Sequence, residues 1–415
     1  MKIAILTSGI LPIPAVNGGA VENHIDFYLK YNDTHRLHDM TVFSIADPKT
    51  EGHPALRSEV NHYEYVEVRS LWAKVRKNLR HRICGEGYYH YTIEYYFHEA
   101  WKRLRKQHYD IILLDNRPGY AVGMDVPEGT KLHIYLHNDL LNSQTKGCRE
   151  IYDKASRILT VSGYIADCVK TINPNDDKCR VVLNGIDLGA FSPRNNALVG
   201  TASKPGGSSA SGSGHGNPPT VSRSEMGFSD DDFVMVFSGR ITKEKGVTEL
   251  IDAMIRLKDY PNIKLMIIGS PFYGDTADED DFVRSLKQKA EAIMDRIRFT
   301  GFIPYSKMPD YLRIADIAVV PSLWDDPCPN TVLEAQATGL PIITTRRGGI
   351  PEEVTEANAI LLATDDSFTD NLTAAITTLY QHPERREAMS AAALEHSKYY
   401  SKQRYAEDFF KALTM

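Results

Sequence analysis

Short, uninterrupted apolar runs recur along this chain of 415 residues, and each is followed by a longer segment with helical spacing. In the first half they read KIAILTS, MTVFSIA, DIILLDN, KLHIYLHN, RILTVSG and CRVVLNGI. A run that is apolar throughout, rather than at every second position, is typical of a strand buried on both faces of a parallel sheet. The pattern predicts a doubly wound, Rossmann-like α/β domain over residues 1–193.

A Gly/Ser-rich stretch, ALVGTASKPGGSSASGSGHGNPPTVS, interrupts this pattern. Because it cannot bury enough apolar surface to offset its ordering entropy, a flexible loop is expected over residues 194–222. The apolar runs then resume as DFVMVFSGR, NIKLMIIGS, RIRFTGF, IADIAVVPS, LPIITTRR and ANAILLA, which predict a second Rossmann-like domain over residues 223–399. Two such domains in tandem are expected to face a central cleft at the carboxyl ends of their strands.

The end of the chain predicts an amphipathic helix over about residues 400–415. Aromatic residues recur in it and just before it, at Tyr399, Tyr400, Tyr405, Phe409 and Phe410. Two arrangements are open: the helix packs on the second domain, which precedes it in the chain, or it crosses back to the first.

Composition excludes several classes of protein. The net charge of −6 gives no overall attraction to nucleic acid, so no such partner is expected. The five cysteines contain no C-x-x-C pair, which argues against a disulfide framework and against a zinc site. No run reaches the ~20 apolar residues of a membrane span, and the apolar start is too short for a signal peptide. A cytoplasmic location is expected.

The stretch FSGRITKEKG predicts a phosphate site in the second domain. A strand ends at Ser238, Gly239 turns the chain, Arg240 and Lys245 supply two cations, and a helix begins after Gly246. Cations beside a helix N-terminus favour a bound diphosphate. The alternative is an ordinary solvated start of a helix. The order of residues is not that of a Walker loop.

Two weaker signals occur in the first domain. Gly18 and Gly19 precede a helix that begins near Ala20, where backbone amides can approach an anion. His137 comes just after a buried strand, at the expected edge of the cleft. Taken alone, the glycines suit an ordinary turn and the histidine suits a structural hydrogen bond. The G-x-G-x-x-G fingerprint of NAD enzymes is absent.

A run of 34 residues, PSLWDDPCPNTVLEAQATGLPIITTRRGGIPEEV, places Asp326 and Glu334 on either side of a Pro-rich turn and the start of a predicted helix. Together with FSGRITKEKG, VSGYI, VLNGID, the Gly-Gly loop and His137, this run resembles glycosyltransferase family 4. That family comprises retaining enzymes of the two-domain GT-B fold that use nucleotide-sugar donors. The resemblance covers nearly the whole chain outside the Gly/Ser-rich stretch.

The resemblance implies roles for named residues. Arg240 and Lys245 would bind the donor diphosphate, beside Gly239 and with the help of amides at Gly18 and Gly19. Further amides would come from the helix start, at Asn330, Thr331 and Val332. Glu334 would accept hydrogen bonds from the ribose, and Asp326 and His137 would contact the transferred sugar.

The sequence departs from the family pattern at one of these positions. The family has two glutamates separated by seven residues, whereas the first acid here is Asp326, which is one methylene shorter. Its neighbour Asp325 leaves open which carboxylate faces the ligand. The departure bears on the donor sugar more than on the class of reaction.

The expected function is transfer of a hexose from a nucleotide sugar, with UDP favoured by family frequency, to a glycan, glycolipid or polysaccharide-precursor acceptor. Retention would follow from displacement on the front face, without a metal or other cofactor because the two cations stabilise the leaving phosphate. The alternatives are a GT-B sugar-nucleotide epimerase and a non-catalytic two-lobed sugar-binding protein.

Two basic stretches occur in the half expected to bind the acceptor, at residues 69–82 and 101–106. In the first, cations surround Leu71, Trp72, Val75 and Leu79. This pattern suits the anionic inner face of a membrane or a lipid-linked acceptor. An ordinary solvated helix is the alternative.

Overall fold

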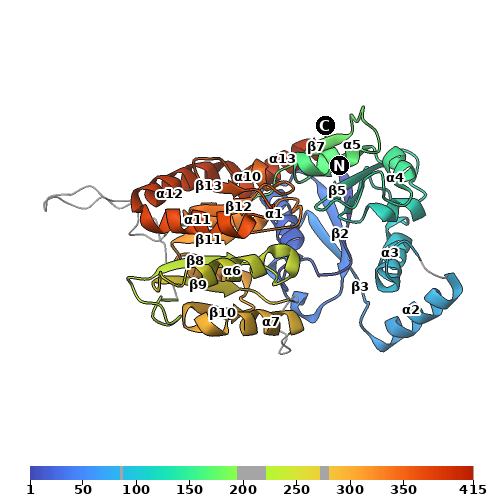
Figure 1. Ribbon diagram of the computed structural model, residues 1–415. Coiled ribbons are helices and arrows are strands. Elements are labelled where there is room, and N and C mark those ends of the chain that lie inside the picture. The colour runs from blue at the N-terminus through green and yellow to red at the C-terminus, as the bar shows by residue number, and fades with distance from the viewer. Residues whose placement is uncertain (85–86, 194–220, 272–279, 415) are drawn as a thin grey trace, which may run out of the picture. The chain divides into compact units, whose positions relative to one another are not determined.

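The computed structural model describes residues 1–84, 87–193, 221–271 and 280–414 (Figure 1). Most of the expected Gly/Ser-rich loop therefore lies outside the described residues. The chain divides into two compact units: unit 1 is Met1–Gly185 with Lys402–Met415, and unit 2 is Ile186–Ser401. The two ends of unit 2 meet, since Ile186 and Ser401 form a parallel bridge.

Unit 1 contains a seven-stranded sheet in the order β3-β2-β1-β4-β5-β6-β7, with every pair parallel. The apolar runs form its central strands, and β4 is buried along its whole length. The strands are β1 (Lys2–Leu6), β2 (Asp39–Ile45), β3 (Asn61–Val66), β4 (Ile111–Asp115), β5 (Lys131–Leu136), β6 (Arg157–Thr160) and β7 (Cys179–Val181). The helices of this unit are α1 (Ala20–His35), α2 (Leu71–Cys84), α3 (Tyr91–Leu104), α4 (Cys148–Lys154), α5 (Gly163–Lys170) and α13 (Lys402–Thr414).

The C-terminal helix α13 packs in unit 1 against α1 (Figure 1). The ring of Phe409 stacks on Tyr28 with centroids 3.9 Å apart, and both rings are buried. Arg157 donates to the backbone oxygen of Ala412 at 2.6 Å. Stacked aromatic burial of this kind stabilises beyond the apolar area that it removes from water.

Unit 2 contains a six-stranded parallel sheet in the order β10-β9-β8-β11-β12-β13. Its strands are β8 (Phe233–Ser238), β9 (Ile263–Ile268), β10 (Ile297–Gly301), β11 (Ile317–Val320), β12 (Ile342–Thr345) and β13 (Ala359–Leu362). Its helices are α6 (Val247–Arg256), α7 (Asp281–Lys289), α8 (Met308–Leu312), α9 (Asn330–Thr338), α10 (Ile350–Glu353), α11 (Phe368–Gln381) and α12 (Pro383–Ser397). A single apolar core joins β8, β9, α6 and α11.

Both sheets follow the doubly wound strand order, so the predicted fold class is confirmed for each unit. In such sheets the direction of winding reverses between two central strands, and ligands bind beyond the carboxyl ends of these strands. The reversal lies between β1 and β4 in unit 1 and between β8 and β11 in unit 2. These two edges are where a site is expected.

Candidate functional site

The two sequence motifs of unit 2 meet at its reversal point. The loop after β8 carries Arg240 and Lys245, and the loop after β11 carries Asp326. The loops are hydrogen-bonded, because the amides of Leu323 and Trp324 donate to the backbone oxygen of Glu244 at 2.8 and 3.1 Å. The fold therefore brings FSGRITKEKG beside the Pro-rich turn.

Gly246 makes this close approach possible. It has a φ of 72°, in the left-handed region, and it precedes the first turn of α6. A Cβ at this position would lie 1.9 Å from the backbone oxygen of Pro321. Only glycine fits both the backbone conformation and the contact.

Lys245 and Asp326 form an ion pair within this arrangement. Only 7% of Asp326 is exposed, whereas Asp325 points elsewhere, with its carboxylate half exposed and 3.6 Å from Arg347. Asp326 is thus the acid held inside the site. Because Lys245 is already paired, an incoming phosphate has to share the ammonium with Asp326 or replace it.

The turn that carries Asp326 is supported from the GGIPEEV segment. The amide of Gly349 donates to the backbone oxygen of Asp326 at 2.8 Å, and the Cys328 thiol donates to Glu353 Oε1 at 2.9 Å. Burial first, and then the charges of Asp326 and Glu352, raise the pKa of Glu353 well above its usual range. Sequence analysis missed this residue; the only signal was a second glutamate in the motif.

The helix α9 follows the turn and carries the remaining donor candidates. Asn330 and Thr331 begin it half-buried, while the amide of Val332 donates to the backbone oxygen of Pro329 at 2.9 Å. The Val332 amide is therefore occupied in this state, so the donors expected at this helix start are fewer than the sequence suggests.

Glu334 lies in the middle of α9 and is 5% exposed. Among the described residues its carboxylate makes no hydrogen bond. Burial raises its pKa to about 7. A buried, unpartnered carboxyl group costs free energy unless a ligand or a proton satisfies it. This supports a ligand contact at Glu334 rather than a surface role.

In unit 1, Gly18 and Gly19 form the positive-φ turn before α1, with φ values of 73° and 106°. A carboxylate already faces this turn, since a Cβ on Gly19 would lie 2.1 Å from Glu22 Oε2. Burial raises the pKa of Glu22 to about 7. The turn has the predicted backbone, but an anion that approached it would meet this acid.

His137 lies immediately after β5 and is buried. Its amide donates to Asn116 Oδ1 at 3.2 Å, and its Nε2 is 3.5 Å from Asp115 Oδ1. His24 stacks on it with ring centroids 6.3 Å apart, and burial, followed by the charge of His137, lowers the pKa of His24 to about 3.

Asp115 is the second residue that sequence analysis missed. It ends β4 at the reversal point of unit 1, is fully buried, and neither of its oxygens has a hydrogen-bond partner among the described residues. The available signal was the acid that closes the apolar run DIILLD. The candidate residues thus form two groups, one in each unit.

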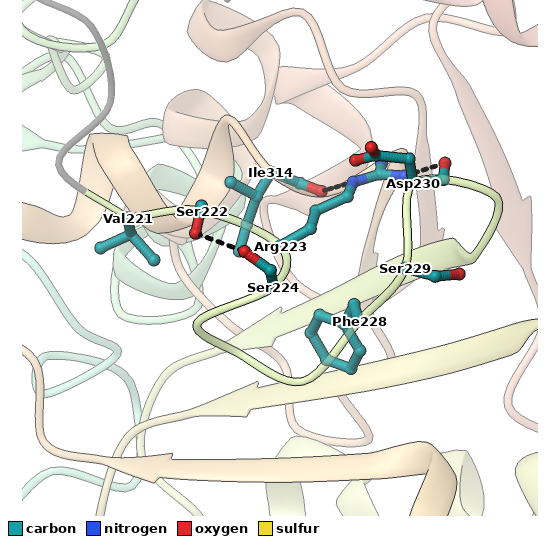
Figure 2. Close-up of a pocket in the computed structure, with 8 residues that line it drawn as sticks. All are labelled: Val221, Ser222, Arg223, Ser224, Phe228, Ser229, Asp230 and Ile314. Atoms are coloured by element: carbon teal, nitrogen blue, oxygen red, sulfur yellow. Dashed lines mark hydrogen bonds between the residues drawn. The ribbon is translucent and has the colours of Figure 1, made fainter.

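A separate pocket of about 280 Å³ lies at the opposite edge of the unit 2 sheet (Figure 2). Arg223 crosses it and donates to the backbone oxygens of Ile314 and Asp232 and to the carboxylate of Asp316, each at 2.9 Å. Asp232 and Asp316 precede β8 and β11, so the pocket lies at the amino ends of these strands. Its arginine joins loops of its own unit, at the edge of the sheet opposite to the two motif loops.

Within the described residues, no cluster of three or more His, Cys, Asp or Glu side chains suits a metal ion. The same part of the chain has no helix that is both long enough and apolar enough to cross a bilayer.

Comparisons with known proteins agree with this architecture. Residues 34–190 match the family described as Glycosyltransferase Family 4, and residues 220–396 match Glycosyl transferases group 1. YtcC of Bacillus subtilis (strain 168), a protein assigned to the glycosyltransferases, is 30% identical over 389 residues, which cover 89% of this chain and 84% of YtcC. Spore coat protein SA of the same organism is 26% identical, over 94% of this chain and 92% of its own.

Among solved structures, Anabaena Alr3699/HepE in complex with UDP superposes with a TM-score of 0.71 at 19% identity, and all of both chains is covered. At this identity the likeness shows the fold. The fold and these matches define a glycosyltransferase of the GT-B type. The chain belongs to the family 4-type glycosyltransferases.

Proposed function

We propose that this protein transfers a hexose from a UDP-sugar to a glycan or lipid-linked acceptor, with retention of the anomeric configuration. The observation that carries the proposal is the meeting of Lys245 and Asp326 at the reversal point of unit 2, with buried Glu334 on the helix that follows. HepE supports the choice of nucleotide, because that protein was crystallised with UDP and with UDP-glucose.

In the proposed reaction, the bond between the anomeric carbon and the diphosphate breaks while the acceptor oxygen bonds to the same face of that carbon. The acceptor proton passes to the leaving diphosphate, so charge and atoms balance. Arg240 and Lys245 stabilise the negative charge that develops on the leaving group. Asp326 and His137 hold hydroxyls of the transferred sugar, and Glu334 holds the ribose. The reaction needs no metal or other cofactor in this scheme.

A screen of nucleotide sugars against saccharide and lipid-linked acceptors tests the function. The proposal predicts release of UDP that depends on the acceptor, with a product that keeps the anomeric configuration. An epimerase would instead isomerise the donor with no acceptor present. A sugar-binding protein would neither transfer the sugar nor isomerise the donor.

The ionisation of Glu334 predicts how donor affinity depends on pH. Its pKa of about 7 means that the carboxylate is mostly protonated at pH 6 and mostly ionised at pH 8. Because hydroxyl groups donate more strongly to a carboxylate than to a neutral acid, affinity for UDP-glucose should rise about tenfold across this interval. UDP-glucose suits the titration since its pyrophosphate diester does not change charge there.

Calorimetry of the Glu334→Gln variant should give an affinity that is lower at pH 8 and nearly independent of pH. The matched control is Asp26→Asn, which removes another carboxyl whose pKa is raised by burial, to about 6, and to which no donor contact is assigned; it should keep the slope. A slope that survives Glu334→Gln would exclude the ribose contact.

We also propose that the chain works in the cytoplasm, at the inner face of the membrane. Its basic stretches at residues 69–82 and 101–106 motivate this part of the proposal.

A further inference from the structure

Helix α2 exposes its apolar side chains and buries a cation. Leu71, Trp72, Val75 and Leu79 are 79%, 77%, 57% and 57% exposed, whereas Ala73 and Lys77 are buried. The helix packs beside α3 (Figure 1). The Lys77 ammonium lies 5.9 Å from the ring centroid of Tyr91. A helix that served only the core of unit 1 would show the reverse pattern.

The four exposed side chains form one continuous surface, which we call the α2 apolar face. At about 100° per residue, Leu71, Val75, Leu79 and Trp72 fall within an arc of about 100°. No two of the other large exposed residues of the described chain share a helix or strand, and single exposed apolar residues are ordinary. A contiguous apolar patch marks an interaction site.

Charge around the α2 apolar face identifies its partner. The sequence has six Lys and Arg residues in 69–82 and no Asp or Glu from Val68 to Gly85. Lys74, Arg76 and Arg82 are exposed.

Glu67, the nearest acid before the helix, accepts hydrogen bonds from the amides of Arg69 and Ser70. Of the six cations, Arg69 pairs with Asp47 at 2.9 Å and Lys77 is buried. The surface therefore presents Trp and Leu side chains among the exposed cations Lys74, Arg76 and Arg82.

We propose that α2 lies in the interface of a membrane leaflet with anionic headgroups, with its apolar face in the acyl region. Lys74 and Arg76 flank that face at the phosphates, and Arg82, which shares its arc near the end of the helix, extends its long side chain to the phosphates. An interfacial helix combines a strongly basic polar side with Trp and Leu on the other side, and has too little apolar length to span. A protein partner that bound this face in a groove would also need acidic side chains there. Binding to such a partner is one outcome of the test below.

The second basic stretch contributes charge without an apolar surface. Within residues 101–106, Trp101 is half-buried and Leu104 is buried. Arg103 donates to the backbone oxygen of Tyr65 at 2.7 Å. Lys102, Arg105 and Lys106 remain exposed. We therefore assign insertion to α2 alone.

Flotation of the full chain with vesicles tests this proposal independently of the donor site, because no nucleotide sugar is present. Vesicles of phosphatidylcholine with 30 mol% phosphatidylglycerol, about a third anionic lipid, should carry the protein at low salt, whereas pure phosphatidylcholine vesicles should not. Raising the salt to about 0.5 M should release most of it, since the Debye length shortens.

Two sets of variants separate the contributions of charge and apolar burial. Lys74→Gln/Arg76→Gln/Arg82→Gln should weaken binding on the order of 100-fold. Leu71→Ser/Trp72→Ser should weaken it roughly tenfold or more. The matched control, Leu37→Ser/Val181→Ser, removes two large exposed apolar residues of the same unit and should bind as the wild type does.

A spectroscopic readout locates the contact. Trp72→Phe should still bind vesicles but should lose the blue shift of tryptophan fluorescence that the wild type shows on binding.

The proposal is overturned if anionic vesicles do not bind the wild type, or if Leu71→Ser/Trp72→Ser binds them equally well. The α2 apolar face would instead bind a second copy of the chain if the protein formed dimers that depend on Trp72, and if these dimers persisted in the presence of vesicles while the protein did not float. A melting temperature close to that of the wild type shows that a variant is folded.

Discussion

Lys245→Ala is expected to lower the turnover number about 100-fold, which corresponds to a loss of about 3 kcal/mol of transition-state stabilisation. The reason is the position of the ammonium: the close approach of Gly246 to Pro321 fixes the adjacent backbone at the reversal point of the unit 2 sheet, and the ion pair with Asp326 holds the ammonium there. The attraction between a fixed cation and the leaving diphosphate increases as negative charge develops on the diphosphate, so the cation stabilises the transition state more than the ground state. The measurement is initial-rate kinetics at saturating donor.

The matched control is Lys243→Ala. Lys243 lies in the same 3-10 turn as Lys245, but its side chain is exposed. Its removal should change turnover by less than about twofold. Since Lys245→Ala also leaves Asp326 without its ion-pair partner, the melting temperature of each variant has to be compared. Equal turnover in the two variants would remove Lys245 from the reaction.

Asp326→Asn is expected to separate sugar transfer from nucleotide binding. Transfer should fall on the order of 100-fold, because a buried carboxylate that accepts hydroxyl hydrogen bonds is replaced by a weaker acceptor. Affinity for UDP should stay the same or increase, since the substitution frees Lys245 from its competing carboxylate. Calorimetry with UDP, together with transfer assays, measures both effects on one preparation.

Asp325→Asn provides the control for that experiment. It alters the adjacent acid, which is half exposed and near Arg347, and should leave both transfer and UDP affinity nearly unchanged. If Asp326→Asn weakened UDP binding as much as it slowed transfer, Asp326 would act on the phosphate site and not on the sugar.

Much of the fold could be predicted because its signals are local. A fully apolar run of four or five residues indicates a strand buried on both faces, and a glycine before a helix indicates the turn that Gly246 makes. The approach of FSGRITKEKG to the Pro-rich turn also follows, once the doubly wound order is assumed.

Features that depend on distant partners could not be predicted. The ion pair of Lys245 with Asp326 joins residues 81 positions apart, and both were assigned to the ligand instead of to each other. The return of α13 to unit 1 rests on stacking of Phe409 on Tyr28, which its own periodicity does not specify. For α2, periodicity showed an amphipathic helix, but only the structure shows that its apolar side is the exposed one.

The same limit explains the two residues that were missed. Asp115 and Glu353 are acids within or beside apolar segments, where sequence alone does not distinguish a buried carboxyl from an exposed one. Their burial makes them stand out in the structure, because a buried carboxyl without a charged partner is costly.

A crystal structure of the full chain with bound UDP is the most direct test of the donor site. The diphosphate should lie within hydrogen-bonding distance of Lys245 Nζ and the Arg240 guanidinium, with the ribose hydroxyls on Glu334. A diphosphate bound away from these side chains, for instance in the pocket crossed by Arg223, would contradict the account.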